Sequence, residues 1–149
     1  MQQSRTFPFV LLVEDHGDSR LILKLLLETL EYHVLAAANG KQALEIARNE
    51  KISLIITDFD LPDMTGAALL RLLNKYDGVI QPPSIVLTAH DEKEYRRMSD
   101  EAGCKAYLLK PVNFDLLVET IERLLCETTA PDDSEENAIN EIPCTAKQT

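Results

Sequence analysis

The chain has 149 residues, of which 45% are hydrophobic and 27% charged, and its formal net charge is −10. This length suits one hydrophobic core, and the composition is typical of a globular domain. So acidic a surface disfavours direct binding to nucleic acid, because it repels phosphate backbones. No apolar run reaches the ~20 residues of a membrane span, and no signal peptide is recognisable, so a cytoplasmic protein without membrane contact is expected.

Five short apolar runs alternate along the chain with five segments of helical periodicity. The apolar runs are residues 9–13, 34–38, 54–56, 85–87 and 106–109, and the helical segments are residues 19–31, 40–49, 67–76, 91–102 and 114–125. Most of the apolar runs are continuous, which is typical of strands buried on both faces of a parallel sheet. The alternation therefore predicts an α/β domain, a five-stranded parallel sheet with helices on both faces.

Two of the helical segments carry further signals. Asn39 is expected to cap the helix at residues 40–49, with the Gln42 side chain reaching back in the manner of a capping box. The segment 91–102 has only a thin apolar stripe, which consists of Tyr95, Met98 and Ala102. A helix anchored by so few apolar side chains is expected to have low local stability.

The two ends of the chain differ from the predicted folded domain, residues 7–126. Residues 1–6 are expected to form a flexible N-terminus. Residues 127–149 contain six acids, one base and few apolar residues, which predicts a disordered acidic tail. The three cysteines are widely spaced and include no C-x-x-C pair, so we expect reduced thiols rather than a zinc site or a disulfide framework.

Polar side chains stand at or just after the ends of four predicted strands. Glu14 and Asp15 follow the first strand, Asp58 ends the third, Thr88 follows the fourth and Lys110 ends the fifth. Parallel strands bring their carboxyl ends to one edge of the sheet, where such folds bind their ligands. Clustered carboxylates repel one another, and Mg²⁺ prefers a few carboxylate oxygens together with water. A carboxylate beside Mg²⁺ and a lysine can attack a phosphoryl group.

Four segments carry these positions: residues 12–15 (LVED), 57–66 (TDFDLPDMTG), 87–89 (LTA) and 107–111 (YLLKP). Together they resemble the receiver domain of two-component response regulators, in family order and at family-like spacing. The resemblance covers about residues 7–125. It implies flavodoxin-like topology with strand order 2-1-3-4-5.

The resemblance also implies specific roles at this edge. Asp58 is implied to be the phosphoacceptor, and Lys110 to contact the phosphoryl oxygens. Glu14, Asp15 and Asp58, with the main-chain carbonyl of Asp60, are implied to hold Mg²⁺, Glu14 largely through water.

A second set of implied roles concerns the response to phosphorylation. Thr88 and Tyr107 match the switch pair of the family, in which the hydroxyl moves to the phosphoryl group and the aromatic ring turns inward. The Lys110–Pro111 bond is expected to be cis, as is usual in the family. Asp60 and His90 occupy positions that border the acceptor in receiver domains and are candidates for tuning the lifetime of the phosphoryl group.

The function implied is that of a single-domain response regulator, a signalling switch rather than an enzyme. It would take its phosphoryl group from a phosphohistidine on a sensor histidine kinase or a histidine phosphotransfer protein. The surface formed by the fourth helix, the fifth strand and the fifth helix would then change. No segment typical of an output domain follows, so a downstream protein target is expected, and a phosphorylation-dependent homodimer is left open.

Two alternatives belong to other functional classes. One is a pseudo-receiver, a binding module that is not phosphorylated. Such modules usually lose an acid or the lysine, whereas this chain keeps Glu14, Asp15, Asp58 and Lys110. The other is a phosphatase of the haloacid-dehalogenase type, with Asp58 as nucleophile and Asp60 as general acid. Its motif normally closes the first strand, and no later acidic motif completes its site here.

The segment 19–31 has more apolar residues than one helix face needs. The predicted inward stripe consists of Ile22, Leu23, Leu26, Leu27 and Leu30. Leu21 and Leu25 lie one turn apart on another face, and exposed leucines flanked by charge are candidate interaction surface. We expect Leu21 and Leu25 to help dock the phosphodonor protein, as this helix does in the resembling family. The alternative is that another part of the chain, such as the tail, covers them.

Overall fold

The computed structural model describes residues 8–75 and 82–128, so the predicted flexible N-terminus and the predicted tail beyond Thr128 lie outside the described residues. The strands of the described part are β1 (Phe9–Val13), β2 (His33–Ala37), β3 (Leu54–Asp58), β4 (Ser84–Thr88) and β5 (Ala106–Leu109). The helices are α1 (Gly17–Thr29), α2 (Gly40–Asn49), α3 (Gly66–Leu73), α4 (Lys93–Glu101) and α5 (Phe114–Thr128).

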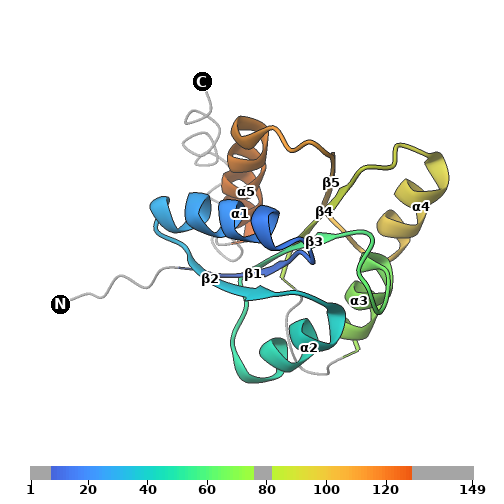
Figure 1. The fold of residues 1–149 in the computed structure, drawn as a ribbon, viewed down its shortest axis with the longest axis horizontal. Coiled ribbons are helices and arrows are strands. Elements are labelled where there is room, and N and C mark those ends of the chain that lie inside the picture. The colour runs from blue at the N-terminus through green and yellow to red at the C-terminus, as the bar shows by residue number, and fades with distance from the viewer. Residues whose placement is uncertain (1–7, 76–81, 129–149) are drawn as a thin grey trace, which may run out of the picture.

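The strands form one parallel sheet in the order β2-β1-β3-β4-β5, which confirms the predicted fold and strand order. Helices α1 and α5 cover one face of the sheet, and α2, α3 and α4 cover the other (Figure 1). All four strand pairings are parallel, so the carboxyl ends of the five strands lie at one edge.

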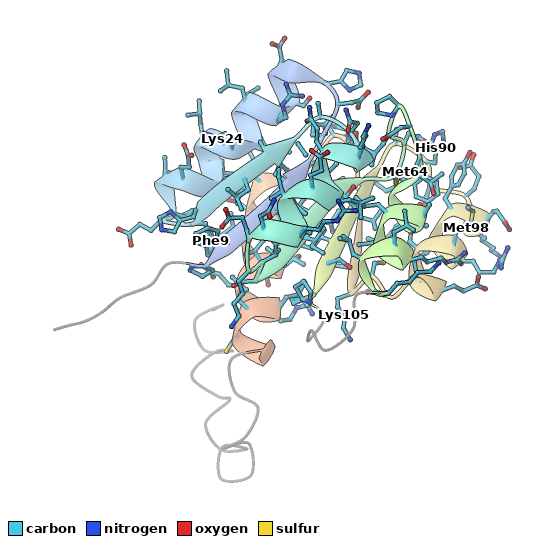
Figure 2. All side chains as sticks on the ribbon, turned by 90° about the horizontal axis from the view of Figure 1, so that it is seen from below. Phe9, Lys24, Met64, His90, Met98 and Lys105 are labelled. Carbon is cyan, nitrogen blue, oxygen red and sulfur yellow. The ribbon has the colours of Figure 1, made fainter. Side chains whose placement is uncertain are left out.

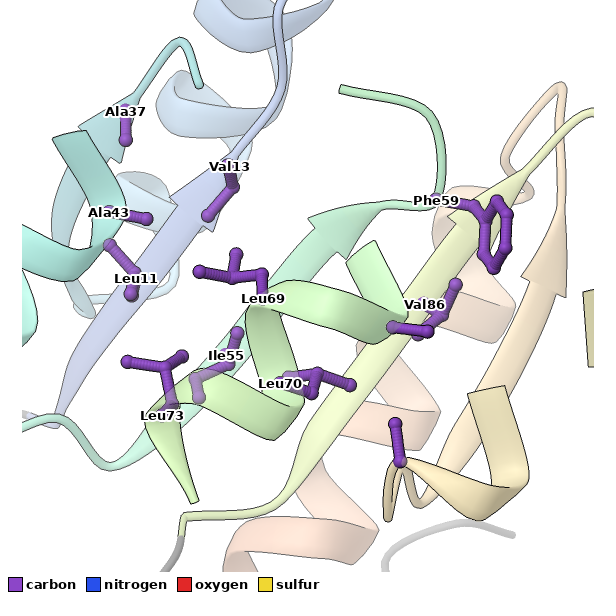
Figure 3. Close-up of a cluster of buried hydrophobic side chains, with 12 residues drawn as sticks. Leu11, Val13, Ala37, Ala43, Ile55, Phe59, Leu69, Leu70, Leu73 and Val86 are labelled. Carbon is purple, nitrogen blue, oxygen red and sulfur yellow. The ribbon is translucent and has the colours of Figure 1, made fainter. Parts of the chain in front are cut away.

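Two clusters of buried side chains fill the space between the sheet and its helices. Figure 3 shows the cluster beneath α2 and α3, in which Leu69, Leu70 and Leu73 of α3 pack against Leu11 and Ile55 of the sheet. The second cluster joins α1 and α5 to the opposite face of the same strands. Every residue of the central strands β3 and β4 is buried, whereas β2 and β5 are half-exposed edges. Continuous apolar runs in the central strands therefore reflect burial on both faces.

Strand β3 extends two residues beyond the predicted run of 54–56. The additional residues, Thr57 and Asp58, are polar, but Thr57 pairs in register with β1 and β4, and Asp58 pairs with β4. The strand continues past the apolar run, because the sheet is held by main-chain hydrogen bonds that any residue other than proline can make. Asp58 ends this strand, as predicted.

The expected N-cap of α2 is present, with Asn39 Oδ1 accepting from the Gln42 amide at 2.8 Å. The Gln42 side chain reaches back to the amide of Ala38 at 2.8 Å, one residue before the cap.

Helix α1 buries a narrower face than predicted. Of the expected inward stripe, only Leu23 and Leu27 are buried, while Ile22 is 51% exposed and Leu30 is 38% exposed. Ile22 lies about 100° around the helix from Leu23, and Leu30 lies beyond the last helical residue. The prediction of a broad buried stripe was therefore wrong.

The two cysteines among the described residues differ in state. Cys104 is a free thiol, and burial, reinforced by the charge of Asp100, raises its pKa to about 11. Cys126 is disulfide-bonded, so the expectation of reduced cysteines was wrong for this residue. The number and spacing of cysteines along the chain do not show which thiols lie close together in the fold.

Among the described helices, none combines the length and apolar character needed to cross a bilayer.

Candidate functional site

The five polar residues predicted at strand ends lie at the carboxyl edge of the sheet. Glu14 and Asp15 directly follow β1, Asp58 ends β3, Thr88 ends β4 and Lys110 directly follows β5. Asp58 pairs in register with Leu87, one residue before Thr88. The topology therefore gathers residues that are as much as 96 positions apart in the sequence.

Lys110 connects two of the carboxyl groups. Its Nζ lies 2.6 Å from Oδ1 of Asp58 and donates a hydrogen bond to Oε1 of Glu14 at 3.2 Å. Glu14 is only 1% exposed and Asp58 only 4% exposed, so both carboxyl groups are largely removed from water. The other oxygen of Glu14 accepts a hydrogen bond from the amide of His16 at 3.2 Å. Buried acidic groups need such partners, since an unpaired buried charge is costly.

The pKa values at this edge diverge because the groups interact. Burial raises the pKa of Asp58 to about 7, and the charge of Glu14 adds to this effect while Lys110 opposes it. Burial also acts to raise the pKa of Glu14, but hydrogen bonds with Asp58 and His16 and the charge of Lys110 outweigh it, so its pKa is lowered. Burial acts to lower the pKa of Lys110, but its contacts with Asp58 and Glu14 raise it overall. The lysine is therefore a permanent cation beside a carboxyl group that holds a proton unusually well.

The acidic residues fit a divalent cation. Glu14, Asp15, His16 and Asp58 each offer one ligand atom, and these four atoms lie within 4.8 Å of one another. Oδ1 of Asp15 is buried and has no hydrogen-bond partner, although His16 Nδ1 lies 3.4 Å away. An unsatisfied carboxylate oxygen beside two further carboxyl groups matches the hard oxygen ligands that Mg²⁺ prefers. A cation would also oppose the burial and the Glu14 charge that raise the pKa of Asp58.

The loops after β3 and β4 meet beside Asp58, the predicted acceptor. The side chain of Asp60 is exposed, and its Oδ2 lies 3.0 Å from Nε2 of His90. Figure 2 shows His90 and Met64, from these two loops, at the same end of the molecule, with Phe9 at the other end. The His90 ring also contacts Tyr95 of α4, with ring centroids 4.5 Å apart. Asp60 and His90 therefore bridge the two loops at the rim of the site.

Thr88 and Tyr107, the predicted switch pair, both contact His90. Oγ1 of Thr88 accepts a hydrogen bond from the His90 amide at 3.0 Å. The hydroxyl of half-buried Tyr107 donates to the backbone oxygen of His90 at 2.9 Å. The guanidinium of Arg96 lies 5.1 Å from the centroid of the Tyr107 ring, which is cation–π geometry. The loop after β4 thus links both residues to α4.

Leu21 and Leu25 lie apart from this cluster, on the outer side of α1. They are 54% and 52% exposed, in agreement with their predicted place on a second face of the helix.

Arg20 is a site residue that the sequence analysis missed. Its guanidinium donates a hydrogen bond to the backbone oxygen of Glu14 at 2.9 Å and reaches that of Asp15 at 3.5 Å. It thereby fixes the backbone of the acidic pair. An arginine in the first turns of the helix that follows two acids was the available signal. The Lys110–Pro111 bond is cis, as expected.

Comparison with known proteins identifies one family. Residues 10–122 match the family described as the response regulator receiver domain. Over 116 residues the chain is 31% identical to the polar-differentiation response regulator DivK of Brucella anthropi, covering 78% of this chain and 94% of DivK. Several other relatives are longer, and the chain spans between 8% and 50% of their length.

Solved structures agree with this assignment. A CheY-like response regulator receiver domain protein from Methanospirillum hungatei aligns with a TM-score of 0.77 and 33% identity, covering 82% of this chain and 96% of that one. The receiver domain of Saccharomyces cerevisiae Ssk1, solved in complex with the histidine phosphotransfer protein Ypd1, aligns with a TM-score of 0.74 and 27% identity, covering 86% of this chain and 97% of the other.

Proposed function

Because this chain belongs to the response regulator receiver domain family, we propose that it is a signalling switch that accepts a phosphoryl group from a phosphohistidine on Asp58. The observation that carries the proposal is the position of Asp58, buried at the end of β3 with Oδ1 2.6 Å from the Lys110 ammonium. The carboxyl groups of Glu14 and Asp15 adjoin it. A buried acid in contact with a fixed cation and a metal-ligating cluster suits phosphoryl transfer better than a structural role.

Receiver domains typically bind Mg²⁺ at an acidic cluster. In this chain Asp15, Asp58 and the backbone carbonyl of Asp60 would hold it, with Glu14 acting largely through water. When bound, the cation would neutralise charge on the phosphoryl oxygens and favour the ionised form of Asp58. The unpartnered Oδ1 of Asp15 supports this ligand set.

The protein's own groups supply the rest of the chemistry. A carboxylate oxygen of Asp58 attacks phosphorus in line, a P–O bond forms, and the P–N bond to the donor imidazole breaks. The imidazole nitrogen keeps the electron pair of that bond and is protonated from water. Lys110 first orients Asp58 and then contacts the phosphoryl oxygens, where its raised pKa keeps it charged. Thr88 is proposed to hydrogen-bond to the same oxygens.

The switch is proposed to act through Thr88 and Tyr107. A phosphoryl group adds about −1.5 to −2 charge at Asp58. If Thr88 turns toward that charge, it gives up the hydrogen bond from the His90 amide. The loop after β4 is then less well fixed, and the hydrogen bond from the Tyr107 hydroxyl to the His90 backbone oxygen can break. The Tyr107 ring can then turn inward. The surface of α4, β5 and α5 would change as a result.

The phosphodonor is proposed to be a sensor histidine kinase or a histidine phosphotransfer protein. The Ssk1 receiver domain in its complex with a histidine phosphotransfer protein supports this class of partner. Leu21 and Leu25 offer exposed apolar side chains on the helix that directly follows the acidic pair. We propose that they contact the donor protein.

Labelling of the chain with acetyl phosphate tests the acceptor. Asp58→Asn should abolish acid-labile labelling while the fold survives, because the amide is isosteric but is no nucleophile. Asp60→Asn is the matched control, two residues away at the rim, and should keep the label. Undiminished labelling of Asp58→Asn would contradict the assignment. A wild-type chain that takes no label would indicate a pseudo-receiver, and rapid turnover of phosphomonoesters that is lost in Asp60→Asn would indicate a phosphatase.

Transfer from a phosphohistidine donor tests the docking surface. Leu21→Ser combined with Leu25→Ser should slow this transfer but leave labelling by acetyl phosphate and the melting temperature nearly unchanged. Leu30→Ser, at the residue that follows α1 and far from the acceptor, should leave both reactions unchanged. A loss of about 2–5 kcal/mol in unfolding free energy for the double variant would instead indicate that the two leucines are buried.

A further inference from the structure

The first turn of α2 has an unusual set of capping partners. A helix begins with amide groups that have no partner within the helix. In α2 the amide of Gln42 is satisfied locally by Asn39 Oδ1. The amides of Gly40 and Lys41 donate instead to Asp63, to Oδ1 at 2.8 Å and to Oδ2 at 2.9 Å. No acid occurs in the first turn of α2 itself, so Asp63, more than 20 residues further along the chain, supplies the anion.

Asp63 belongs to the loop that runs from the end of β3 to the start of α3. This loop also contains Asp60. Its two ends are fixed, because the Gly66 amide donates to the Phe59 oxygen at 2.6 Å and residues Asp60 and Thr65 form an antiparallel bridge. The tip between them projects towards α2.

A second contact joins the tip of this loop to α2. Gly40 faces Met64 so closely that a Cβ at residue 40 would lie 2.5 Å from Sδ of Met64. The tip therefore meets the start of α2 through two consecutive residues, by a bidentate pair of hydrogen bonds and by close packing. The hydrogen bonds, led by that of Gly40, lower the pKa of Asp63, as expected for a carboxylate at a helix N-terminus.

We propose that Asp63 is a positioning residue for the cation site, because it ties the loop to α2 and so fixes where the backbone carbonyl of Asp60 points. This inference rests on the proposed Mg²⁺ site, to which Asp60 would contribute that carbonyl. The side chain of Asp60 is 62% exposed, and its Oδ2 lies 3.0 Å from Nε2 of His90 at the rim. The backbone of Asp60 is instead governed by the loop that Asp63 anchors.

Two variants separate this role from general helix capping. Asp63→Ala and Asn39→Ala each remove a side chain that caps the first turn of α2, so both should lower the melting temperature by several degrees. Only Asp63→Ala also frees the loop. We expect it to raise the dissociation constant for Mg²⁺, measured by calorimetry on the whole chain, about tenfold, the scale typical for loss of a residue that orients metal ligands. Asn39→Ala should leave that constant within about twofold.

Hydrogen exchange without metal provides an independent readout. The amides of Leu61 and Gly66, which donate within the loop, should exchange faster in Asp63→Ala and at the wild-type rate in Asn39→Ala. Asp63→Asn, which keeps one acceptor oxygen, should give intermediate values in both measurements. Equal Mg²⁺ affinity in Asp63→Ala and wild type, or equal weakening by Asn39→Ala, would overturn the inference. If the wild-type chain bound no Mg²⁺, the proposed function would fail, and unchanged exchange at these amides would then overturn the positioning role separately.

Discussion

Helices α3 and α4 lie on the same face of the sheet but are anchored very differently. Five of the eight residues of α3 are buried, including Leu69 and Leu70. Of the nine residues of α4 only Ser99 is buried, and its hydroxyl has no hydrogen-bond partner. The apolar contacts of α4 come from half-buried Tyr95 and Met98. One face of the sheet therefore holds a fixed helix beside the acceptor strand and a loosely held helix beside the predicted switch residues.

The starts of the two helices show the same contrast. Thr65 caps α3 by accepting from the Ala68 amide at 3.0 Å, whereas Glu92, at the N-cap of α4, makes no capping side-chain hydrogen bond. Gly66 packs so tightly beneath Asp58 that a Cβ there would collide with the Asp58 backbone oxygen. The contrast indicates that α3 fixes Asp58, the proposed acceptor, while the position of α4 depends on contacts that the proposed phosphorylation would change.

Truncation of a core side chain in each helix should give the largest difference. Leu69→Ala removes a fully buried side chain and should lower the unfolding free energy by about 2–5 kcal/mol. Met98→Ala should cost about 1 kcal/mol, because water already reaches this side chain. Urea titrations of both variants measure the two values. Equal losses would show that α4 is as firmly anchored as α3.

Hydrogen exchange with a phosphoryl mimic, beryllium fluoride with Mg²⁺, should sharpen the contrast. Amides of α4 and β5 should change protection by about 1–3 kcal/mol, the usual scale of coupling between sites, because their contacts include Tyr107 and the His90 loop. Amides of α3 should keep their protection. Changes confined to Asp58 and its loop would contradict a switch that includes α4.

Removal of the unpartnered hydroxyl in α4 should make the two helices more alike. Ser99→Ala should raise the unfolding free energy by about 1 kcal/mol, since it removes a buried polar group without a partner and improves helix propensity. Thr120 is the matched control, because its buried hydroxyl donates to the Leu116 oxygen at 2.7 Å. Thermal unfolding should show a gain for Ser99→Ala and none for Thr120→Val. A loss in Ser99→Ala would mean that its hydroxyl is satisfied.

Substitution of the N-cap residues should change the unfolding free energy by about 1 kcal/mol or less. Thr65→Ala should lower the unfolding free energy by about 1 kcal/mol, and Glu92→Asn, which introduces a favoured N-cap, should raise it by about 0.5 kcal/mol. Differential scanning calorimetry of the two variants measures both shifts. No gain from Glu92→Asn would indicate that the start of α4 is not what limits its stability.

Local sequence patterns predicted the strands, the helices and the polar residues at the strand ends. Continuous apolar runs located the strands, and Asn39 marked the start of α2, because both signals depend on near neighbours in the sequence. Family resemblance added the strand order and the cis bond at Pro111. The partners of Asp63 and Arg20 escaped prediction, because each depends on where another segment lies in three dimensions. The exposure of Ile22 escaped for the same reason, since apolar character alone does not show which side of a helix meets the sheet.

The contact between Lys110 and Glu14 has a consequence for synthesis of the protein. The two residues are 96 positions apart, so the acidic pair is made long before the lysine that completes the acceptor site. Domains fold as units while the ribosome extends them from the N-terminus. A nascent chain that ends before β5 has Asp58 but lacks its cation. Under the proposed function, competence for phosphorylation at Asp58 would therefore arise only when almost all of the domain has been translated, and shorter nascent chains would not signal.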